Sequence, residues 1–220
     1  DEAFHQAVNE CVQPFLADKK AFHHGGMHAI KGYIRMKNKM LSKDDHRYRQ
    51  KPRPAHNVDI NRTLAAAKDS GCMISMLDAL QKRFGPFAKW KNEMSHDRST
   101  ASQYFHLRKM MVSVVYEHRG SGGEPVTFSM LCSDETVQRK WEEYRAATPS
   151  GIPKCIWKKR VDMAEEWLRH PSLANDVVKI VAEVQCVLSE YRDVRLRMHE
   201  TYKVFRAVDG ASLHLDYVQT

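Results

Sequence analysis

The stretch from Leu173 to Met198, LANDVVKIVAEVQCVLSEYRDVRLRM, carries the strongest periodic signal in the chain. Its apolar residues recur at alternating steps of four and three, which is the spacing of a heptad seam. Phe205 continues the same phase, and no Pro or Gly lies between Ser172 and Val208. The pattern predicts one long α-helix over residues 172–209, with a protein interface formed by Val177, Ile180, Val184, Val187, Tyr191, Val194 and Met198.

A heptad seam of this kind serves two architectures. It can form a coiled-coil contact with a partner or with a second copy of the chain, or it can pack inside a single helical bundle. Both remain open from the sequence, so the long helix either packs on residues 1–171 or projects from them.

Shorter amphipathic patterns precede this stretch. Apolar residues at helical spacing predict helices over about residues 3–16, 27–41, 60–67, 73–84, 99–118, 134–147 and 153–168. The predicted fold class is all-α, an irregular helical bundle with a long C-terminal helix. A small β-hairpin near residues 112–131 is the alternative there, because Val112–Tyr116 is β-branched and Gly120–Gly123 could form a turn.

The positive charge of the chain is concentrated in one segment. Residues 31–62 contain ten Lys or Arg against three Asp, a surplus of seven, whereas the whole chain has a net charge of +8. Residues 42–58 lack apolar periodicity and include Pro52 and Pro54, which predicts an exposed basic loop. The expected nucleic-acid-binding residues are Lys31, Arg35, Lys37, Lys39, Lys43, Arg47, Tyr48, Arg49, Lys51, Arg53 and Arg62.

These residue types favour phosphate contact. Lys and Arg neutralise phosphates and release counterions without needing a shaped pocket. The interleaved Tyr33 and Tyr48 could stack on unpaired bases, which favours RNA over DNA. An acidic protein or lipid surface, or a solvated loop with no specific partner, would use the same charges. No RNA-recognition, KH, homeodomain or zinc-finger pattern is present.

Catalytic and metal-binding patterns are weak. His24 and His28 are four residues apart, but Gly25 and Gly26 separate them and no HExxH motif occurs. The five cysteines are widely spaced and form no CxxC pair, which disfavours a disulfide framework and a zinc finger. We therefore expect no cofactor, no metal and no catalytic residues.

The sequence thus predicts a non-catalytic basic helical protein that binds nucleic acid, more readily RNA than DNA, as a candidate ribonucleoprotein subunit. The first alternative is a structural or adaptor protein that binds other proteins, or itself, through the C-terminal helix. The second is an enzyme with a histidine-bound metal. No apolar run is long enough to span a membrane, and the cysteine usage suggests a reducing intracellular compartment.

Overall fold

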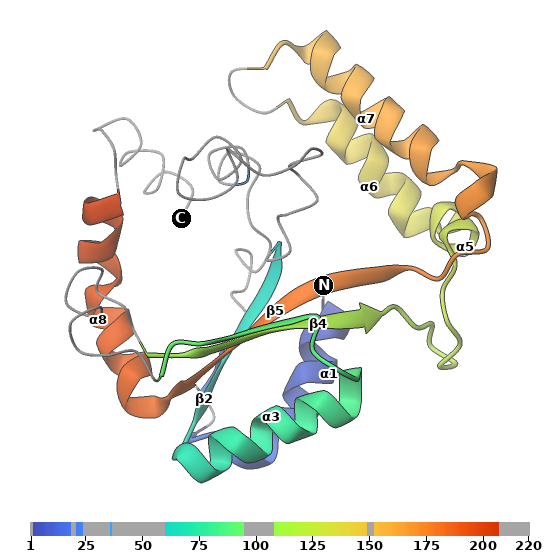
Figure 1. Ribbon diagram of the computed structural model, residues 1–220. Helices are drawn as coiled ribbons and strands as arrows, with labels where there is room; N and C mark the ends of the chain where they lie inside the picture. Colours follow the sequence, from blue (N-terminus) through green and yellow to red (C-terminus); the bar gives the residue numbers. More distant parts are fainter. Residues whose placement is uncertain are drawn as a thin grey trace. The chain divides into compact units, whose positions relative to one another are not determined.

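The computed structural model describes residues 2–18, 21–23, 36, 60–94, 108–148 and 152–206 (Figure 1). These residues form helices and a mixed β-sheet, so the chain is of the α/β class and the predicted all-α bundle is wrong. Contacts divide the chain into two units, one of residues 1–116 with 181–220 and one of residues 117–180. This division differs from the one expected from the sequence, which separated residues 1–171 from 172–209.

The described strands of the first unit form a five-stranded sheet in the order β1-β2-β5-β4-β3. β1 (Phe22–His23) pairs antiparallel with β2 (Asn61–Ala67), and β2 pairs parallel with β5 (Lys179–Leu188). β3 (Lys89–Asn92) pairs antiparallel with β4 (Met110–Glu117). β5 is the central strand and joins the two antiparallel pairs.

The predicted long C-terminal helix is wrong over its first half. Residues 179–188 form β5, and the helix α8 begins only at Ser189 and ends at Arg206. In β5, Val184 is completely buried and Val187 is 1% exposed. β-Branched Val and Ile suit a buried strand, because they pack well on the pleated surface. Ile180, Val184 and Val187 of β5 also fall at heptad spacing, which is why the strand was predicted as part of a helix.

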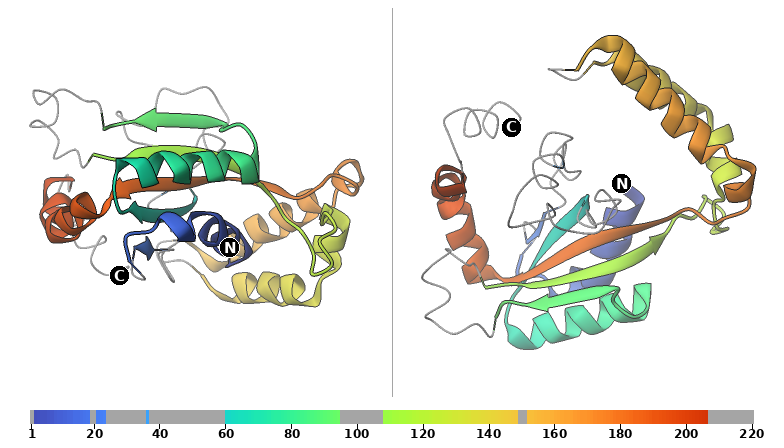
Figure 2. Two further views of the ribbon diagram at one scale, coloured as in Figure 1. Left: turned by 90° about the horizontal axis from the view of Figure 1, so that it is seen from below. Right: turned by 45° about the horizontal axis from the view of Figure 1, so that its top comes forward.

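Helices α1 (Glu2–Val12) and α3 (Ser70–Phe84) cover one face of this sheet (Figures 1 and 2). A short 3-10 helix (Gln13–Phe15) follows α1. Both helices were predicted from their apolar spacing, and α3 ends before Gly85-Pro86 as expected. The buried core between the helices and the sheet contains Phe4, Val8, Val12, Met73, Met76, Leu80, Val112, Val114, Tyr116, Val184 and Cys186.

Two other predicted helices are strands. Residues 61–67 form β2, whose Ala65, Ala66 and Ala67 are fully buried between neighbouring strands and the layers on the sheet. Residues 110–117 form β4, so the second half of the predicted helix 99–118 is wrong. The hairpin alternative for 112–131 is right for its first strand and for the turn at Gly120–Gly123, across which Arg119 bridges Pro125, but it fails beyond the turn because residues 128–133 form helix α5. The predicted helix 27–41 and the loop 42–58 lie outside the described residues, Met36 excepted.

The second unit contains α5 (Phe128–Ser133), α6 (Glu135–Ala146), α7 (Lys154–Leu168) and a short 3-10 helix (Pro171–Leu173). The sequence predicted α6 and α7 at nearly these bounds. Asp134 caps α6 by accepting hydrogen bonds from the backbone N–H groups of Thr136 and Val137. Few described residues of this unit are buried; they include Val126, Cys132 and Val161.

Leu80 tests the core on the α3 side of the sheet. It is fully buried, whereas Ile74 on the same helix is 62% exposed. We expect Leu80→Ala to lower the free energy of unfolding by about 2–5 kcal/mol, because it leaves a cavity. Ile74→Ala, the matched control, should change it by less than about 0.5 kcal/mol. Chemical denaturation measures both, and equal effects would contradict the placement of α3.

Asp69 fixes the beginning of α3. Its carboxylate accepts a hydrogen bond of 2.8 Å from the backbone N–H of Cys72, which satisfies one of the free donors of the first helical turn. The same bond holds the pKa of Asp69 below its ordinary value of 3.8. The charged carboxylate therefore stabilises the folded state more than the neutral form does.

We expect Asp69→Ala to lower the melting temperature at neutral pH. Because the folded pKa of Asp69 is lowered, its contribution is complete above the unfolded pKa and is lost as pH falls through the folded pKa. The difference in melting temperature between wild type and variant should therefore shrink on acidification below pH ~4. Asp69→Asn, which keeps an acceptor, is the control. A difference that stays constant with pH would refute the role of the charge.

Candidate interaction surfaces

The basic segment lies in the connection between β1 and β2. In the register of these strands, Phe22 faces Ala65 and His23 faces Leu64, so the connection leaves and re-enters the sheet at neighbouring positions. Its two ends are thereby held close together by antiparallel pairing. Ten of the predicted nucleic-acid-binding residues belong to this connection and lie outside the described residues, namely Lys31, Arg35, Lys37, Lys39, Lys43, Arg47, Tyr48, Arg49, Lys51 and Arg53.

Arg62 is the one predicted nucleic-acid-binding residue that the structure describes. It is half-buried in β2, on the face of the sheet opposite to α1 and α3, and its register partner in β5 is Glu183. Glu183 also accepts a hydrogen bond of 2.5 Å from the side chain of Gln185, which is only 7% exposed. With a carboxylate directly across the strand pair, Arg62 is a poorer phosphate ligand than a solvated arginine.

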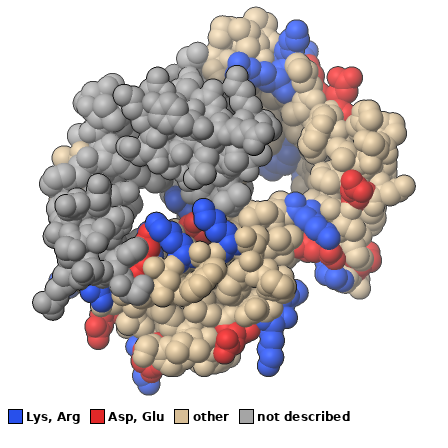
Figure 3. Space-filling view, viewed as in Figure 1, with Lys and Arg blue, Asp and Glu red and all other residues tan. Residues whose placement is uncertain are grey.

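Elsewhere the two signs of charge are mixed. Outside residues 31–62 the sequence has 25 Lys or Arg against 24 Asp or Glu. On the face seen in Figure 3, the described cationic and anionic side chains alternate rather than gather into a single patch. At one edge of the sheet, for example, Glu93 lies within 2.5 Å of the Lys91 ammonium group and 3.5 Å of that of Lys109.

The predicted protein-interface residues do not form one stripe. Val184 and Val187 are buried in β5, and Ile180 lies near the start of that strand. Val177 forms an isolated bridge with Thr127. Tyr191, Val194 and Met198 lie on α8, where Val194 is 45% exposed. A contact made through all seven residues on one helix is therefore incompatible with the fold.

A network of ion pairs around Arg145 joins α6 to α7. Its guanidinium donates to Asp162 at 2.8 Å and to Glu142 at 2.7 Å, and a third bond reaches Glu165. These bonds raise the pKa of Arg145, the bond to Asp162 most of all. The indole N–H of Trp157 on α7 also donates to the backbone oxygen of Tyr144 on α6, at 2.6 Å. With few buried side chains, the α6–α7 hairpin depends on these polar links.

The outer surface of α7 exposes apolar side chains. Ile156 is 45%, Met163 57% and Trp167 64% exposed. They are seven and four residues apart, so they lie along one stripe of the helix. We call Ile156, Met163 and Trp167 the α7 stripe. The stripe was not predicted, because the sequence also offers a second apolar set, Trp157, Val161, Ala164 and Leu168, of which Val161 is buried and Trp157 and Leu168 are partly buried.

Two of the described cysteines are held as thiols by burial. Burial raises the pKa of Cys186 to about 12 and also raises that of Cys11, so both thiols stay protonated near neutral pH. Among the residues that the structure describes, no group of three His, Cys, Asp or Glu could hold a metal ion. His24, His28, His96 and His106 lie outside those residues.

Within the described parts of the chain, none of the helices combines the length and the apolar character needed to cross a membrane. The chain matches no known protein family, and neither a characterised protein nor a solved structure shows significant similarity to it.

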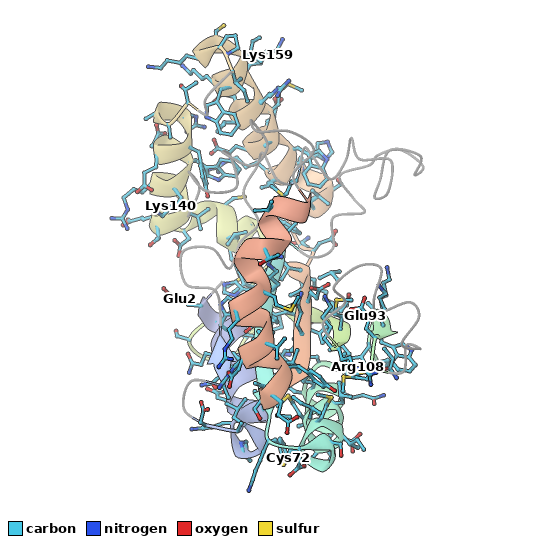
Figure 4. The ribbon with its side chains drawn as sticks, turned by 90° about the vertical axis from the view of Figure 1, so that its left-hand side faces the viewer. Glu2, Cys72, Glu93, Arg108, Lys140 and Lys159 are labelled. Carbon is cyan, nitrogen blue, oxygen red and sulfur yellow. The ribbon has the colours of Figure 1, made fainter. Side chains whose placement is uncertain are left out.

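Removing the Arg145 guanidinium should loosen the α6–α7 hairpin. We expect Arg145→Met to lose the links from α6 to Asp162 and Glu165 of α7, while Glu165 keeps only its pair with Arg169 on its own helix. Lys140→Met is the control, because the Lys140–Glu143 pair lies on α6 alone and is more than half exposed at both ends. Figure 4 labels Lys140 on α6.

Amide hydrogen exchange measures this effect locally. The α6 and α7 amides should exchange faster in Arg145→Met than in wild type or Lys140→Met, while β2, β4 and β5 stay protected. Equal protection in the two variants would show that the network does not hold the hairpin.

Proposed function

We propose that the protein binds nucleic acid, and RNA in preference to DNA, without catalysing a reaction, and that it does so as a ribonucleoprotein subunit. The observation that carries the proposal is the location of the charge. Seven of the eight net positive charges come from residues 31–62, and the rest of the chain is nearly neutral. A local surplus of this size attracts a polyanion, whereas an even distribution of the same charge does not concentrate a field.

The sheet supports this proposal by tethering the basic segment. β1 and β2 hold both ends of the connection in neighbouring antiparallel strands, so contact between the segment and a polyanion requires no change in the core. The interleaved Tyr48 adds a ring that can stack on an unpaired base, which is the contact that favours single-stranded RNA. Arg62, opposite Glu183, contributes least among the predicted ligands.

A protein-binding adaptor role is the second candidate. The sequence predicted the protein-binding surface on the C-terminal heptad seam, whose residues the structure divides between β5 and α8. The second unit offers a different apolar surface, the α7 stripe. Apolar side chains of this size, arranged along one helix face, are typical of protein contacts. The two functions use different residues, so they can be separated by mutation.

Charge reversal tests RNA binding. The variant Arg47→Glu, Arg49→Glu, Lys51→Glu and Arg53→Glu should weaken the affinity for single-stranded RNA at least ~100-fold at low salt, since each lost phosphate contact also removes counterion release. The slope of log affinity against log salt should fall in magnitude by about 3–4 for the four contacts. Fluorescence anisotropy with labelled RNA, and with DNA of the same sequence, measures both quantities.

The control reverses four exposed cations outside the segment, Lys82, Arg139, Lys154 and Lys158, and so changes the net charge equally. It should keep most of the affinity and of the salt slope. If both variants lost the same affinity for RNA, binding would depend on the net charge of the chain and not on the basic segment. Unchanged binding in the first variant would refute the proposal. Circular dichroism verifies that both variants are folded.

A further inference from the structure

The α7 stripe is flanked by one basic and one acidic residue. Their charges are complementary when two copies of α7 pack antiparallel. Ile156, Arg160, Met163 and Trp167 follow one another at steps of four, three and four, which are the core positions of a short heptad seam. Lys159 and Glu166 lie seven residues apart along the same flank of this seam, and both are exposed. Figure 4 labels Lys159 on α7 and Lys140 on α6.

We propose that α7 is a homodimer interface, in which the α7 stripe packs antiparallel on the α7 stripe of a second copy of this chain. The seam is symmetric about the point between residues 161 and 162. A two-fold axis there places Ile156 opposite Trp167 of the second copy, and Arg160 opposite its Met163. Because a two-fold contact uses the same patch on both chains, each of these pairs occurs twice.

Charge complementarity identifies the occupant. In an antiparallel helix pair, residues on the same flank of the two seams face each other. Lys159 of each copy then faces Glu166 of the other, which gives two ion pairs of opposite charge. In a parallel pair, Lys159 would face the flank that carries Ala164 and would find no acid there. A partner helix with a basic residue in place of Glu166 would be repelled by Lys159.

The apolar part of the contact has the residue types of a protein interface. Trp and Met are enriched at the centres of such interfaces, and the aliphatic stem of an Arg covers apolar surface. A helix of 15 residues is only about 22 Å long, so we expect a dimer of modest affinity.

The dimer is tested first with Trp167→Ala. Sedimentation velocity of the full chain over a range of ~1–300 μM should show a monomer–dimer equilibrium for wild type, and Trp167→Ala should raise the dissociation constant at least ~30-fold. Trp167 is 64% exposed, so this variant should fold normally. Ile74→Ala, which truncates an equally exposed apolar residue on α3, is the control and should dimerise as wild type does.

Charge exchange tests the antiparallel arrangement. In a dimer of Lys159→Glu both facing pairs consist of two acids, and in a dimer of Glu166→Lys both consist of two lysines. Each variant alone should therefore dimerise roughly 10-fold more weakly than wild type. A mixture of the two variants should recover the dimer, since every facing pair is again of opposite sign. Lys158→Glu makes the same charge change off the seam and should have little effect.

Three results would overturn the proposal. Wild type could remain monomeric throughout the concentration range, which would leave the α7 stripe to a different partner or to none. The dimer could survive Trp167→Ala, which would place its interface elsewhere. The mixture of Lys159→Glu and Glu166→Lys could fail to recover the dimer, which would refute the antiparallel pairing. None of these results depends on the RNA-binding proposal, because the two use different residues.

Discussion

The fold depends on the pairing of β5 with β2. These strands are more than a hundred residues apart in the sequence, yet they pair in parallel over all seven residues of β2. Ala182, Val184, Cys186 and Val187 of β5 are almost completely buried, so the strand is covered on both faces. Without this strand, the β1–β2 pair and the β3–β4 pair would be separate two-stranded ribbons, which are marginally stable on their own. A contact of such long range also makes folding slow in comparison with a helical bundle.

The same pairing determines where the chain can accommodate additional residues. β1 and β2 are antiparallel neighbours, and the basic segment forms the connection between them. β4 and β5 are also neighbours, and residues 118–178 form the connection between them, begun by a hydrogen bond from the backbone N–H of His118 to the backbone oxygen of Val178. Both candidate surfaces are therefore insertions between paired strands. Long insertions at such positions cost little stability when the strand ends are already held together, so the core and the surfaces can change independently.

Four of the helices could be read from the sequence, and the paired strands β2 and β5 could not. α1, α3, α6 and α7 have apolar residues at helical spacing with clear stops such as Gly85-Pro86 and His170-Pro171. β2 has no clear period of two, and its Leu64 and Ala67 follow Ile60 at helical spacing. β5 does alternate, from Ala182 through Glu183, Val184 and Gln185 to Cys186, but its Ile180, Val184 and Val187 also fit a heptad seam. Ser189 and Glu190, which begin α8, were read as interior residues of the predicted helix although they suit a helix start. The pairing with β2 identifies residues 179–188 as a strand.

The two candidate surfaces differ in how far the sequence reveals them, and the difference is physical. Net charge is a sum over residues, so the surplus in residues 31–62 is visible before any fold is known. The exposure of a side chain depends on which other helices and strands pack on it. The sequence of α7 alone therefore does not show which of its two apolar sets is buried. The Arg145 network and Val161 turn one set inward, and Ile156 and Trp167 are left outside. If two chains join through that outer set, each assembly carries two basic segments. The second contact with one polyanion then becomes intramolecular, and affinity rises without any new kind of contact. Dimerisation through α7 would raise the affinity for the polyanion, and binding to one polyanion would in turn stabilise a dimer of modest affinity.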